Sequence, residues 1–154
     1  MRLTVVGCAG SFPGPDSAAS CYILEAEGFR LVIDLGNGAL GPLQKFIGLF
    51  GIDAICLSHL HADHCVDLYS YSIARTYSPA GLQPSLPVYG PAGTCERIGL
   101  LHGPGARSPG SRDAAVMADA VVRERAKGCA AREPRDYAQS WPSSWASASS
   151  RVPE

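Results

Sequence analysis

The stretch Ser58-His59-Leu60-His61-Ala62-Asp63-His64 decides how this 154-residue chain is interpreted, because it holds three of the chain's four histidines. Imidazole and carboxylate groups are the ligands that zinc and similar divalent metals prefer. Without a bound ion, so many polar side chains at one chain reversal would be costly to remove from water. The stretch therefore predicts a metal site formed by His59, His61, Asp63 and His64.

The segment just before this stretch predicts how the ligands are arranged. The segment over residues 52–57 is short and mostly apolar and contains two isoleucines, which is typical of a buried strand. Side chains two positions apart in an extended segment share a face, so His59 and His61 can reach one metal. Asp63 and His64 open a predicted helix, where an anionic group is stabilised, and can reach a second metal. The spacing thus predicts two adjacent metal positions.

The string from Ser58 to Leu68, SHLHADHCVDL, resembles the HxHxDH signature of the metallo-β-lactamase superfamily. Three further segments, in the expected order, resemble the ribonuclease Z-like phosphodiesterase branch: residues 5–11 (VVGCAGS), 31–38 (LVIDLGNG) and 88–94 (VYGPAGT). The resemblance covers about residues 1–100. It implies an α/β fold of the αββα sandwich type, represented mainly by its N-terminal half.

The resemblance also implies a chemistry, which is hydrolysis of phosphodiester bonds at a binuclear zinc centre, with Mn²⁺ or Fe²⁺ as alternative metals. The three histidines would be ligands only, whereas Asp63 would also orient the nucleophilic water and so count as catalytic. The superfamily completes both metal positions with two more histidines and a bridging aspartate from its C-terminal half. The one remaining histidine here, His102, matches none of those motifs, so we expect weak metal binding.

Two functions follow from this incomplete ligand set. The first is a metal-dependent hydrolase whose missing ligands come from another subunit or a rearrangement. The second is a truncated, non-catalytic part of such an enzyme that binds metal weakly.

Charge restricts the substrate class. Residues 102–154 hold eight of the thirteen Lys and Arg and six of the fourteen acidic residues, so residues 1–101 carry a net charge of −3. This balance gives no electrostatic support for binding extended nucleic acid. Within the resemblance, a small phosphodiester such as a cyclic nucleotide, or an RNA 3′ end, is the expected substrate. A homo-oligomer of this chain is also compatible with the sequence.

The chain lacks the signs of a membrane or secreted protein. No apolar stretch is long enough to span a bilayer, and the apolar run at residues 2–6 is too short for a signal-peptide core. The six cysteines include no CxxC pair and are interpreted as reduced thiols. We therefore expect a cytoplasmic protein with no membrane partner.

Three residues near the motif have structural interpretations that we favour over functional ones. Asp34 follows a predicted strand and is interpreted as a turn residue whose carboxylate accepts hydrogen bonds from local backbone amides, with a direct chemical role as the alternative. Cys65 is interpreted as a small buried apolar residue rather than a ligand. His102, without partners nearby in the sequence, is interpreted as an ordinary structural histidine.

Hydrophobic periodicity predicts the remaining elements. Short strands are expected over residues 2–6, 21–24 and 29–33, with the last two joined as a hairpin. Helices are expected over residues 40–50 and 66–77. Alternating strands and helices indicate the α/β class.

The composition changes after Leu101. Residues 102–154 contain no Leu, Ile or Phe and are rich in Ala, Arg, Pro, Gly and Ser, so they cannot bury a core like that of residues 1–101. We therefore divide the chain into a metallo-β-lactamase-like N-terminal half (1–101) and a poorly ordered, low-complexity tail (102–154), where a helix over 114–127 is the one element considered. The tail is either a genuine one or the out-of-frame translation of a GC-rich gene.

Overall fold

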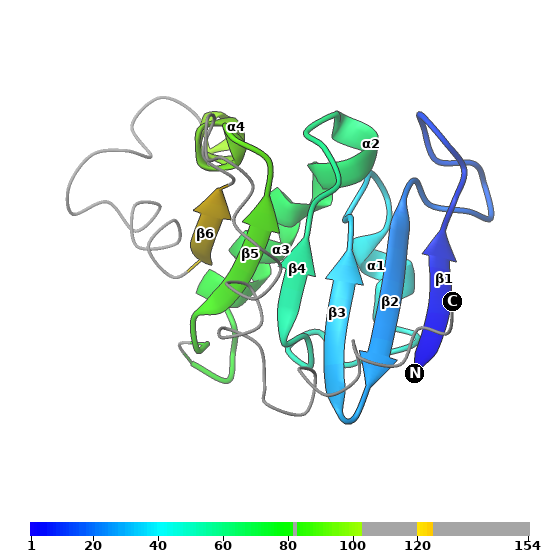
Figure 1. Ribbon diagram of the computed structural model, residues 1–154, viewed down its shortest axis with the longest axis horizontal. Coiled ribbons are helices and arrows are strands. Elements are labelled where there is room, and N and C mark those ends of the chain that lie inside the picture. Colours follow the sequence, from blue (N-terminus) through cyan, green and yellow to red (C-terminus); the bar gives the residue numbers. More distant parts are fainter. Residues whose placement is uncertain (82, 103–119, 125–154) are drawn as a thin grey trace, which may run out of the picture.

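The computed structural model describes residues 1–81, 83–102 and, for the backbone alone, 120–124. They form one six-stranded sheet in the order β1-β2-β3-β4-β5-β6, so each strand lies beside the one that precedes it in the chain (Figure 1). The pairs β1–β2 and β2–β3 are antiparallel, and the pairs from β3 to β6 are parallel. The mixed sheet with interspersed helices confirms the α/β class.

The strands are β1 (Arg2–Gly7), β2 (Cys21–Ala26), β3 (Phe29–Ile33), β4 (Ala54–Cys56), β5 (Leu86–Gly90) and β6 (Ala120–Glu124). The helices are α1 (Leu40–Leu43), α2 (Ala62–Cys65), α3 (Asp67–Thr76) and α4 (Thr94–Leu101). Figure 1 shows α1 and α3 behind the sheet and α2 at the edge where β4 ends. The carboxyl ends of β3 and β4 therefore meet the start of α2.

The core lies between the sheet and the helices behind it. Ile23, Val32, Ile55 and Val88 are in register across β2 to β5 and are buried, so they share one face of the sheet. Apolar residues of the helices join the same core, among them Tyr71 of α3. One sheet with helices on one face is half of an αββα sandwich, as the resemblance implied.

The predicted strands over residues 2–6, 21–24 and 29–33 are confirmed, with bounds shifted by one or two residues. The strand expected over 52–57 is shorter and spans only β4. The helix expected over 66–77 is confirmed as α3. None of the helices in the described part of the chain has the length and apolarity needed to cross a bilayer.

The helix expected over residues 40–50 is wrong after Leu43, where α1 ends. Residues 44–46 continue as turns whose backbone N–H groups bond three residues back rather than four. Glycine at position 48 disfavours a longer helix because it loses more backbone freedom than any other residue. The apolar spacing still holds in part, since Ile47 is buried as the prediction requires.

The helix considered over residues 114–127 is wrong in its described part. Residues 120–124 form β6, which pairs in parallel with β5. Two adjacent β-branched residues, Val121 and Val122, favour the extended backbone. The remaining predictions for the tail concern residues 103–119 and 125–154, which lie outside the described residues.

Cys21 in β2 gives a prediction for the pH dependence of stability. Burial, followed by the negative charges of Asp34 and Asp67, raises the pKa of this thiol from 9.0 to about 12. Between those values the unfolded chain has released a proton that the folded chain retains. The free energy of unfolding should therefore fall as pH rises from 9.0 toward 12, at up to about 1.4 kcal/mol per pH unit for this group.

The measurement is urea unfolding at a series of pH values for the wild type and Cys21→Ala. The variant should lose the part of the slope that comes from this thiol, while the partly buried thiol of Cys56, whose pKa is also raised by burial, keeps its own part in both proteins. Equal slopes in the two proteins would contradict the prediction.

Candidate metal centre

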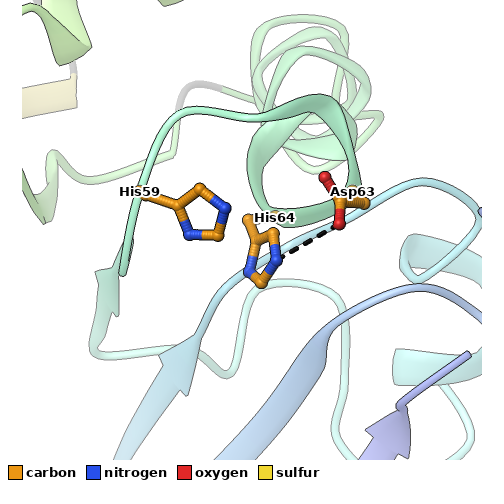
Figure 2. A group of neighbouring side chains, drawn as sticks. All are labelled: His59, Asp63 and His64. Carbon is orange, nitrogen blue, oxygen red and sulfur yellow. Dashed lines mark ion pairs between the residues drawn. The ribbon is translucent and has the colours of Figure 1, made fainter. Parts of the chain in front are cut away.

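Three of the four predicted ligands meet where β4 ends and α2 begins. His59 lies in the loop after β4, and Asp63 and His64 lie in α2 (Figure 2). One ligand atom from each of these three residues lies within 4.8 Å of the other two. Two imidazoles and a carboxylate at this separation fit a borderline divalent cation such as zinc.

His61 lies beside this group rather than in it. It is the exposed N-cap residue of α2, and its ring centroid is 4.8 Å from that of His59. The expected pairing placed His59 with His61 and Asp63 with His64, whereas the structure groups His59 with Asp63 and His64. The role of His61 as a ligand stays a prediction.

The His64 ring has a different partner on each nitrogen. Its Nε2 lies 3.3 Å from Oδ2 of Asp63, as the dashed line in Figure 2 shows. Its Nδ1 lies 2.7 Å from Oδ2 of Asp34. Metal-binding histidines usually donate their second ring N–H to a carboxylate or carbonyl, which fixes the ring and its tautomer. His64 has that arrangement, with Nδ1 on Asp34 and Nε2 facing Asp63.

Asp34 corrects one of the sequence interpretations. It is buried, and instead of local amides its carboxylate accepts the backbone N–H of Ser58 at 2.7 Å and the Ser58 hydroxyl at 2.9 Å. Together with the bond to His64, these contacts reach 24 and 30 residues along the chain. The pairing of β3 with β4 creates them, and a local turn pattern carries no information about that pairing. Asp34 therefore holds Ser58 and the candidate ligand His64 in place through hydrogen bonds.

Main-chain hydrogen bonds hold α2 against the ends of β2 and β3. The carbonyl oxygen of Asp63 accepts the N–H of Ser20 at 3.1 Å, and that of His64 accepts the N–H of Leu35 at 2.8 Å. Gly36 passes so close that an added Cβ would lie 2.6 Å from the carbonyl carbon of Asp63. Only glycine allows the two segments to approach this closely.

The structural interpretations of Cys65 and His102 are confirmed. Cys65 is buried in the core, and burial raises the pKa of its thiol, so the side chain stays neutral and is a poor ligand. The ring of His102 packs edge-on against Tyr69, 4.7 Å between centroids, and its Nε2 lies 3.4 Å from the hydroxyl of Ser72. These two contacts lie on α3.

Comparisons with known proteins show the family to which the chain belongs. A family model described as the metallo-beta-lactamase superfamily matches residues 14–135. An uncharacterized protein of Mycobacterium tuberculosis strain H37Rv is 45% identical over 105 residues, which are 68% of this chain and 38% of that protein. The match to the family model passes residue 101, whereas the division of the chain at that residue stays a prediction.

Two solved structures are similar in fold and sequence. The metallo-beta-lactamase fold protein YhfI from Bacillus subtilis matches with a TM-score of 0.56 and 32% identity, over 62% of this chain and 39% of that one. The short form of human tRNase Z matches with a TM-score of 0.56 and 30% identity, over 64% of this chain and 38% of that one. The chain therefore spans about two fifths of the length of these relatives.

Proposed function

Because this chain belongs to the metallo-β-lactamase superfamily, we propose that it acts as a metal-dependent hydrolase of phosphodiester bonds. The observation that carries the proposal is the convergence of His59, Asp63 and His64 within 4.8 Å at the end of β4. The similarity to the short form of human tRNase Z supports a phosphodiester over other ester and amide substrates.

We propose zinc as the metal, with two ions in the complete centre and Mn²⁺ or Fe²⁺ as alternatives. His59, His61 and His64 would bind metal, and Asp63 would bind metal and orient the attacking water. When bound, such ions lower the pKa of water and stabilise negative charge on the attacked phosphoryl group. Since Asp34 accepts from Nδ1 of His64, that ring is held as a ligand and not as a mobile acid or base.

The proposed substrate is a small phosphodiester, of the cyclic-nucleotide type, or an RNA 3′ end. A formal net charge of −1 does not favour a long polyanion. A cytoplasmic location and association of identical chains remain predictions that accompany this proposal.

The test pairs metal content with turnover. The wild-type chain, purified without chelator and supplied with Zn²⁺, should hold two metals per chain and hydrolyse bis(p-nitrophenyl) phosphate. His61→Ala should abolish that turnover because it removes a proposed ligand. The matched control is His102→Ala, which removes an imidazole that packs on α3 and should leave turnover unchanged.

A second candidate function is metal binding without turnover. It is favoured by the small ligand set, since the only group of potential ligands within the described residues has three members. A metal usually needs three or four protein ligands, and two adjacent ions need more. Less than one weakly held metal per chain with no turnover in the same experiment would support this second function and reject the first.

A further inference from the structure

Ser20 joins the metal-binding segment to the start of β2 through both its main chain and its side chain. Its N–H donates to the carbonyl oxygen of Asp63 at 3.1 Å, and its carbonyl oxygen accepts the N–H of Gly36 at 2.9 Å. Its hydroxyl donates to Oδ2 of Asp34 at 3.1 Å. With only 8% of its surface exposed, this serine is buried beside the centre and has a defined partner for each polar atom.

The bond from Ser20 adds a fourth donor to the Asp34 carboxylate. Oδ1 accepts the Ser58 N–H, whereas the Ser58 hydroxyl, the Ser20 hydroxyl and Nδ1 of His64 all lie within hydrogen-bond distance of Oδ2. The Ser20 hydroxyl and the His64 ring therefore meet at the same oxygen atom. Each bond restricts rotation of the Asp34 carboxylate, and the carboxylate in turn orients the His64 ring. A proton held on Nδ1 leaves the lone pair of Nε2 available to a metal.

We propose that Ser20 is a positioning residue of the metal centre. Through Asp34, its hydroxyl keeps the His64 imidazole in the orientation and tautomer that present Nε2 to the space shared with His59 and Asp63. The inference rests on the proposed function, because it assumes that a metal enters this space. Nothing in the sequence singled out Ser20, since it lies 38 positions before the first residue of the histidine motif.

The test begins with Ser20→Ala, which removes the hydroxyl but keeps both main-chain hydrogen bonds. Affinity for Co²⁺, followed by visible absorption, should fall about 10-fold, at the lower end of the range for partners of metal ligands. In the metal-free chain at a pH where imidazole is neutral, NMR of the ring nitrogens should show His64 changing from one Nδ1–H tautomer to a mixture. Ser20→Thr, which retains a hydroxyl, should restore both properties.

The matched control is Ser72→Ala, which removes a hydroxyl that donates within α3 to the carbonyl oxygen of Tyr69. It should leave both measurements at wild-type values. If circular dichroism shows that Ser20→Ala folds poorly, Ser20→Cys replaces it, with a weaker donor of similar size and the same expected direction.

The outcomes separate this inference from the proposed function. Wild-type Co²⁺ affinity and a single tautomer in Ser20→Ala would overturn the positioning role. If the wild type itself binds no Co²⁺, the proposed function fails. The tautomer measurement then decides alone, since a mixture in the variant supports the role of Ser20 and a single tautomer rejects it.

Discussion

Replacing His64 with alanine is expected to lower the affinity of the chain for Zn²⁺ by more than about 100-fold. Loss of a partner that only orients a ligand already costs about 10- to 100-fold in metal affinity. His64 is proposed as a ligand itself, and its ring also lies against His59, 3.8 Å between centroids. Its removal takes away one of three converging groups and leaves the buried carboxylate of Asp34 with one donor fewer.

Competition with a chromophoric chelator measures this change, and urea unfolding without metal shows whether the variant remains folded. His102→Ala serves as the control, because it also removes an imidazole but from the contact between α3 and α4. Equal Zn²⁺ affinity in His64→Ala and the wild type would show that the three-residue group does not bind the metal.

Replacing Gly36 with alanine is expected to lower the free energy of unfolding by about 2 to 3 kcal/mol, near the upper end of the usual cost of overpacking. An added Cβ would lie 2.6 Å from the carbonyl carbon of Asp63, and main-chain atoms cannot turn aside as a flexible side chain can. Either the loop after β3, which holds Gly36, or α2 has to move. Because α2 holds Asp63 and His64, Zn²⁺ affinity should fall together with stability.

Gly41→Ala is the matched control, since an added Cβ at Gly41 has no heavy atom of the surroundings within 4 Å and the residue lies in α1. Alanine there should change stability by less than about 1 kcal/mol, because its better helix propensity is opposed by Pro42, which disfavours helical backbone at a preceding residue that has a Cβ. Equal stabilities for Gly36→Ala and the wild type would mean that the two segments do not approach as closely as described.

The histidine motif predicted where the centre lies because its information is local. Spacing of two in an extended loop, followed by a helix start, placed His59, His61, Asp63 and His64 at one end of β4, and the structure brings three of these four, His59, Asp63 and His64, together. Which residues of the motif group together could not be predicted in the same way. The backbone turns at His61, the N-cap of α2, so the alternation expected for a strand ends there and His61 leaves the group.

The support of the centre could not be predicted, because it depends on contacts between distant segments. In the sequence, Asp34 is an aspartate before a glycine-containing turn, and its role becomes visible only when β3 pairs with β4. Ser20 lies in a serine- and alanine-rich segment that has no chemical signature. The bond of Asp34 to His64 spans 30 residues and its bond to Ser20 spans 14, and only the pairing of strands brings these residues together.

The order of the sheet has a consequence for folding kinetics. Each strand neighbours the one synthesised before it, and Ser20, Asp34 and Ser58 lie at the ends of three consecutive strands. The contacts of Asp34 with Ser58 and His64 span 24 and 30 residues, and the entropic cost of closing a loop grows only slowly with its length. A nascent chain that has emerged as far as α2 already carries every donor to Asp34 among the described residues. The candidate ligands and the donors that hold Asp34 are therefore all in place along the chain before β5 and β6 are synthesised.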